Sequence, residues 1–157
     1  MKLHRRSNLT IFIPSNRTAA SGKPAPMDGL NEIVASNRAD KFLGARRERE
    51  NLEHCAWFIR LAMRKAHYKP MTSYARQACD VHICVHEINR RRDVSNVYGG
   101  VLKYALDAMT GRHKSGAGAI WDDNSRWLRY LTPSIVIDPE NPGIEITVIP
   151  LEEPNEA

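Results

Sequence analysis

An alternating stretch over residues 78–88 restricts the fold of this chain more than any other feature. Its apolar positions are Val81, Ile83 and Val85, and the positions between them are His82, Cys84 and His86. Successive side chains of a strand point to opposite faces of a sheet, so this pattern predicts a half-buried strand. A sheet with one buried face needs a second layer to cover it.

Two helical patterns can provide that layer. Apolar residues recur at helical spacing over 43–66, and Lys69-Pro70 follows. A second helix is expected over 96–110, with Ser95 or Asn96 as its N-cap and Gly111 as its end. Further strands are predicted at 9–14, 119–122, 134–137 and 144–149. The pattern predicts an α/β (α+β) fold with a single mixed sheet and two main helices.

The chain of 157 residues suits one domain with one core. We expect three parts: an N-terminal strand and flexible loop (1–28), a folded domain (29–150) and an acidic tail (151–157). Cys55, Cys79 and Cys84 form no even framework, so reduced thiols and a cytoplasmic location are expected. No run of about 20 apolar residues predicts a membrane span.

The charge is unevenly distributed. Residues 138–157 hold six acidic side chains and no Lys or Arg, which leaves a net +11 on the first 137 residues. Such a field attracts polyanions, although charge alone is equally compatible with an ordinary basic surface.

The second predicted helix carries a polar stripe. Asn96, Gly100, Lys103 and Asp107 share one face, at offsets of four, seven and eleven residues. The adjacent glycines 99 and 100 would let a phosphate or another backbone approach closely. The alternative is a solvated face with a Lys103–Asp107 ion pair of little energetic weight.

Carboxylates follow two of the predicted strands. Asp93 follows the strand predicted at 78–88, and Asp122 and Asp123 follow the apolar step at 118–121. Separate carboxylate positions of this kind suit Mg²⁺, with Mn²⁺ as a substitute, and the ion would activate water for phosphodiester hydrolysis. A plain turn is the alternative for the Asp-Asp pair.

Two basic segments flank these acidic positions. They are expected to hold phosphates of DNA beside the cation, together with the amide of Asn96. The segments comprise Arg90, Arg91 and Arg92, and Arg112, His113 and Lys114. Each is also compatible with a solvated run of charge.

In combination, these motifs resemble the RusA-type Holliday junction resolvases. That family has an Asp-x-Asp-Asn motif, then a Lys, an Asp-Ala-Leu and a later Asp-Asp. This chain has Asp93-Val-Ser-Asn96, Lys103-Tyr-Ala-Leu-Asp107-Ala-Met and Trp121-Asp-Asp123, and upstream Gly29-Leu-Asn-Glu-Ile. The similarity covers residues 29–150.

The resemblance implies a homodimer that cuts four-way DNA junctions by Mg²⁺-dependent hydrolysis and leaves 5′-phosphate ends. It implies that Asp93 and Asp123 are metal ligands with Asp122 beside them, in one shared cleft. It also implies that Lys103 contacts the scissile phosphate.

Two departures affect these roles. Ser95 stands where the family has a second aspartate, and Glu87 is a candidate substitute. The segment from Asn96 to Lys103 is longer by about one helical turn, which keeps the direction of the lysine but moves it ~5 Å along the axis.

Three other interpretations remain open. The first is a DNA-binding protein of the same fold that has lost catalysis through Ser95. The second is a zinc protein that uses His82, Cys84 and His86, with His54 or Cys55 as further ligands. The third is an RNA-binding domain in which Trp57, Trp121 and Trp127 stack on unpaired bases.

Overall fold

A four-stranded mixed sheet forms one layer of the computed structural model, which describes residues 6–152. The strand order is β1-β6-β4-β5, with β4 and β5 parallel and the other pairs antiparallel. The strands are β1 (Leu9–Pro14), β4 (Cys79–Glu87), β5 (Leu128–Ile137) and β6 (Gly143–Pro150). The expected α+β class with a mixed sheet is confirmed.

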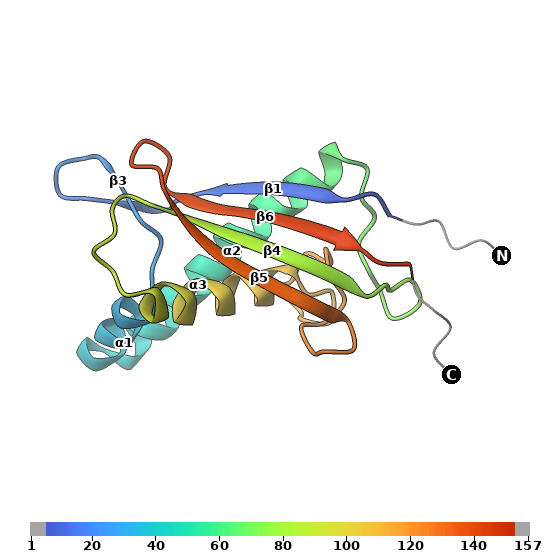
Figure 1. Cartoon of the computed structure of the whole chain (residues 1–157). Helices are drawn as coiled ribbons and strands as arrows, with labels where there is room; N and C mark the ends of the chain where they lie inside the picture. The colour runs from blue at the N-terminus through green and yellow to red at the C-terminus, as the bar shows by residue number, and fades with distance from the viewer. Residues whose placement is uncertain (1–5, 153–157) are drawn as a thin grey trace.

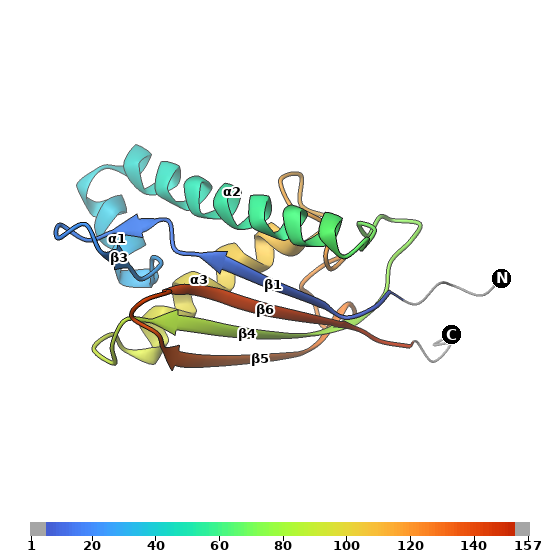
Figure 2. The same cartoon turned by 90° about the horizontal axis from the view of Figure 1, so that it is seen from above.

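The helices form the second layer, on one side of the sheet (Figure 2). They are α1 (Leu30–Ala39), α2 (Lys41–Lys65) and α3 (Val94–Met109). The core lies between the layers, where Ile59 of α2 and Val101 of α3 are fully buried with Ile83 and Ile146 of the sheet. Among residues 6–152, no helix has the length and apolar character that crossing a membrane requires.

Strand β4 follows the predicted alternation. Val81, Ile83 and Val85 are at most 1% exposed and face the helices. His82 is exposed, and Cys84 and His86 are partly exposed on the open face. The period-2 pattern therefore identified both the strand and its buried face.

The helix boundaries differ from those predicted. Helix α2 begins at Lys41, because the Asp40 side chain accepts a hydrogen bond from the Phe42 amide. Helix α3 begins at Val94 with Asp93 at the N-cap, so the predicted cap at Ser95 or Asn96 is wrong. Asn96 lies inside the helix, where its side-chain Oδ1 accepts a hydrogen bond from the Asn31 amide at 2.6 Å.

The early loop region contains a short hairpin, β2 (Arg17–Thr18) and β3 (Pro24–Ala25). Strand β1 pairs along its full length with β6, so the N-terminal strand belongs to the same sheet as residues 79–150. The strand predicted at 119–122 is reduced to an isolated bridge between Thr110 and Ile120. Helix α1 was not predicted as a separate element.

Candidate functional site

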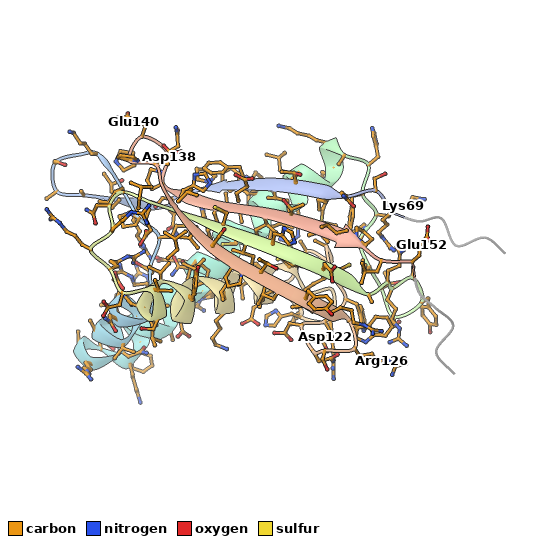
Figure 3. All side chains as sticks on the ribbon, viewed as in Figure 1. Lys69, Asp122, Arg126, Asp138, Glu140 and Glu152 are labelled. Carbon is orange, nitrogen blue, oxygen red and sulfur yellow. The ribbon has the colours of Figure 1, made fainter. Side chains whose placement is uncertain are left out.

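Helix α3 separates the predicted carboxylates. Asp93 precedes its first residue, whereas Asp122 and Asp123 follow the loop after its last. A helix of 16 residues is ~24 Å long. Figure 3 places Asp122 at the end of the fold where β5 starts, and α3 begins at the opposite end (Figure 1). The structure does not bring Asp93 into a shared cleft with Asp122 and Asp123.

The Asp93 end of α3 is open to solvent. Asp93 makes no side-chain cap hydrogen bond, and Ser95 beside it is exposed. Arg90 and Arg91 are exposed as well. This end therefore presents one carboxylate, two guanidinium groups and a hydroxyl.

Arg92 differs from its two neighbours because its guanidinium is held inside the fold. It donates two hydrogen bonds to Glu87, at 2.8 and 2.9 Å, and one to Glu32 at 2.7 Å. A fourth bond reaches the Met27 carbonyl at 2.8 Å. Glu87 is only 3% exposed, so it is a buried partner of Arg92 and cannot replace the ligand missing at Ser95 without breaking this pair.

The paired glycines of α3 admit a backbone. A Cβ atom on Gly100 would lie 2.5 Å from the carbonyl carbon of Gly29 and 2.7 Å from the Leu30 nitrogen. The sequence allowed either a phosphate or another backbone to approach the glycines. In the structure, the backbone at the start of α1 lies against Gly100.

The other end of α3 holds two adjacent carboxyl groups with opposite pKa shifts. Arg112 donates a hydrogen bond to Asp122 at 2.8 Å, and this bond lowers the pKa of Asp122 below 3.8. Desolvation, together with the hydrogen bond and charge of Asp122, raises the pKa of Asp123 above 3.8. The negative charge of Asp107 adds to that rise. As the pH rises, Asp123 therefore keeps its proton longer than Asp122 does.

The polar stripe of α3 opens toward α2. Lys103 and Asp107 form an ion pair at 3.9 Å, and Lys103 is 75% exposed. Both line a groove of about 350 Å³ between α2 and α3, with Gly100 and His113. Arg49, Glu48 and Glu53 of α2 line its other side. Three of the four stripe residues thus line one groove. The fourth, Asn96, accepts a hydrogen bond from the Asn31 amide instead.

The glycine-rich loop places the remaining predicted basic residues near the carboxyl pair. The Arg112 amide donates to the Trp121 carbonyl at 3.0 Å, which brings the loop alongside residues 121–123. His113 and Lys114 are exposed at the tip. Gly118 has φ +87°, a conformation that side chains rarely adopt, so the loop requires glycine there.

The carboxyl groups at this end could bind a Mg²⁺ ion only with the smallest number of protein ligands that such ions use. Such an ion needs one or two carboxylates when water and substrate phosphates complete its shell. Asp122 and Asp123 provide two. Across the part of the chain that the structure describes, no group of three or more His, Cys, Asp or Glu residues is arranged to hold a metal.

The proposed zinc ligands do not converge. His82, Cys84 and His86 share one face of β4 as predicted, but four residues of strand separate the histidines by ~13 Å. His86 lies between two carboxylates instead, 3.3 Å from Asp138 and 3.3 Å from Glu145.

No protein-family model and no curated protein sequence matches this chain. The similarity to RusA-type resolvases therefore depends on the residues quoted above.

One aromatic cluster near the carboxyl pair was missed by the sequence analysis. The Arg76 guanidinium lies 4.7 Å from the Trp127 ring and 5.8 Å from the Trp121 ring. Trp121 directly precedes Asp122. No spacing rule connects residue 76 to residues 121 and 127, because the fold alone brings them together. Of the three tryptophans, Trp127 is buried, Trp121 is partly buried and Trp57 on α2 is 66% exposed.

Proposed function

We propose that this protein is a metal-dependent DNA endonuclease of the RusA type, which resolves four-way junctions as a homodimer. Its chemistry would take place at the C-terminal end of α3. The observation that supports this most strongly is the adjacent Asp122–Asp123 pair after α3, where Arg112 donates a hydrogen bond to Asp122 at 2.8 Å and the charge of Asp107 acts on Asp123. One or two carboxylates, with water and substrate phosphates, are the usual protein ligands of Mg²⁺.

In this proposal, Asp122 and Asp123 would hold a Mg²⁺ ion. When bound, the ion would polarise the phosphodiester and lower the pKa of a water molecule. Arg112 keeps the Asp122 carboxyl ionised at 2.8 Å and fixes its direction. Because the pKa of Asp123 is raised, cation binding should weaken in acid before Asp122 itself is protonated.

Lys103 would supply positive charge to the transition state. Its ammonium group is largely exposed and is held only loosely, by Asp107 at 3.9 Å. An exposed ion pair of this length contributes little to stability, so the lysine can move to a phosphate at low cost. His113 and Lys114 would contact the DNA backbone beside it.

A second candidate function is junction binding without cleavage. The placement of Asp93 favours it, because the Asp93 end and the Asp122 end of α3 are ~24 Å apart in one subunit. Ser95 stands in place of an aspartate at the Asp93 end, and within residues 6–152 neither end has three carboxylates arranged to hold one metal ion. Such a protein would bind junctions equally well with and without Mg²⁺.

The test is cleavage of a synthetic four-way junction in Mg²⁺, in Mn²⁺ and in EDTA, with a linear duplex as control. We expect nicking that needs metal, prefers the junction and is lost in Asp123→Asn. Tight junction binding without nicking in either metal would support the binding protein instead.

A further inference from the structure

Two adjoining grooves lie at the C-terminal end of α2, outside the site described above. One has a volume of about 440 Å³ and the other about 520 Å³. They share the turn His67-Tyr68-Lys69, which forms the ridge between them. The grooves therefore border on each other and form a two-part depression at the end of the helix.

The charge of this depression is of one sign. Its lining contains five basic side chains and one histidine, and no described Asp or Glu lines either groove. The basic residues are Arg6, Arg60, Arg64, Lys69 and Arg76, and the histidine is His67. Glu152 lies at the same end of the molecule (Figure 3) but lines neither groove. An unbroken set of cations in a concave surface concentrates positive potential.

Arg6 and Arg60 are fixed by neutral groups, so their charges are not compensated. Arg6 donates to Gln77 Oε1 at 2.7 Å and to the Ala75 carbonyl at 2.9 Å. Arg60 donates to the Ser115 carbonyl at 3.1 Å. Each guanidinium is thus oriented before any ligand binds, which reduces the entropy lost on binding.

Arg76 is oriented by aromatic rings in the same manner. Its partners are Trp127 at 4.7 Å and Trp121 at 5.8 Å. Across residues 6–152, none of Arg6, Arg60 and Arg76 forms an ion pair with a carboxylate. Their positive charges are therefore not neutralised by any carboxylate in this part of the chain.

The central turn has an uncommon backbone. His67 has φ +53°, a left-handed conformation that is rare outside glycine. Hydrogen bonds from the His67 amide to Arg64 and from the Tyr68 amide to Met63 hold it. The turn directs the Tyr68 hydroxyl inward to the Ala119 carbonyl at 2.7 Å and leaves Lys69 exposed.

The helix dipole opposes this site but does not outweigh it. The C-terminal end of a helix carries roughly half a negative charge. Arg64 and Lys65 in the last turn offset that charge, and the amides of Ala66 and Tyr68 occupy carbonyls of the last turn. The remaining cations give the grooves a net attraction for anions.

We propose that the two grooves bind the phosphate backbone of one DNA arm and direct it toward Asp122. A ligand with phosphates at regular intervals fits two adjacent basic depressions better than a single anion does. The contact between Arg76 and Trp121, the neighbour of Asp122, joins the grooves to the acidic pair. The assignment of this polyanion to DNA rests on the proposed function. The assignment of phosphates as the bound groups rests on the two basic grooves.

The experiment measures binding of a fluorescent four-way junction and of a linear duplex by anisotropy, in EDTA and over a series of salt concentrations. The variant is Arg64→Gln with Lys69→Gln, because both side chains are exposed and make no described ion pair. Each lost phosphate contact lowers the slope of log K against log salt by ~0.9, so we expect a decrease of about 1.8 for the pair. Affinity for the junction should fall at least tenfold.

The matched control is Arg38→Gln with Lys41→Gln, at the other end of α2, which removes the same charge. Its affinity should stay within twofold of the wild type, and thermal melting should show that both variants are folded. Equal losses in the two variants, or no loss in either, would overturn the proposal. Tighter binding of an RNA duplex than of the junction would overturn the assignment to DNA. EDTA prevents cleavage, so an inactive nuclease leaves this test intact.

Discussion

Two sets of arginine side chains in this protein differ in what their guanidinium groups touch. Arg17, Arg47 and Arg92 bind buried carboxylates and are less than one-third exposed. Arg6 and Arg60 bind carbonyl and amide oxygens, which leaves their charge uncompensated. The first group holds loops to the core, and the second carries charge to the surface.

Arg92 should contribute to stability, although it belongs to a run of arginines predicted from the sequence to bind DNA. Arg92→Gln removes the partner of the buried Glu87, and breaking a buried pair lowers the free energy of unfolding by about 3 kcal/mol or more. Arg91→Gln, on an exposed side chain, should change it by less than about 0.5 kcal/mol. Urea denaturation of both variants measures the difference. Equal stability of the two variants would contradict the structural role of Arg92.

Asp28 should make stability depend on acid. Burial would raise the pKa of Asp28, but hydrogen bonds from Arg47, Asn51 and Arg17 outweigh burial and bring it below 3.8. Its stabilising contribution is therefore present above pH 3.8 and is lost as the pH falls through the folded-state pKa. Denaturation of Asp28→Asn should show lower stability at pH 7 and a shallower decline below pH 4. An unchanged acid slope would contradict this assignment.

At the scale of elements, α1 and α3 meet where Gly29, which precedes α1, lies against Gly100 of α3. Gly100→Ala would place its Cβ against the Gly29 backbone at 2.5 Å, which has no room to move. We expect a loss of about 1–3 kcal/mol from overpacking. Gly99→Ala meets only the flexible Leu30 side chain, at 3.2 Å, and gains up to about 1 kcal/mol in helix propensity.

Thermal melting of the two alanine variants tests this contact. Gly100→Ala should melt lower than the wild type, and Gly99→Ala should melt near it or above. The reverse order would mean that the helices meet differently.

The elements with strong periodicity could be predicted, and those defined by tertiary contacts could not. Strand β4 alternates because one of its faces packs on the helices, so the residue types at 81–86 were enough to predict which face is buried. Helix α1 has only Ile33 and Ser36 as buried residues, too few to form a pattern. The start of α3 was misplaced because Asn96 resembles a cap in sequence but binds the Asn31 amide in the fold.

At the scale of the whole molecule, the direction of α3 decides which functional residues meet. The sequence identified Asp93, Lys103, Asp107, Asp122 and Asp123 as polar positions around one helix. It could not show that the helix separates the first of them from the last two, because spacing along a chain does not give direction in space. The basic grooves were missed for a related reason, since their residues lie as far apart in sequence as Arg6 and Arg76.

The central claim is that the chemistry occurs at the C-terminal end of α3, with Asp122 and Asp123. The most direct test compares single-turnover junction cleavage by Asp123→Asn and Asp93→Asn in Mg²⁺. Our account predicts a loss of about 100-fold or more for Asp123→Asn. It predicts a change of no more than about twofold for Asp93→Asn, whose exposed side chain caps α3 without a hydrogen bond. An equal loss in Asp93→Asn would contradict the account, because it would mean that Asp93 completes the site from a second subunit.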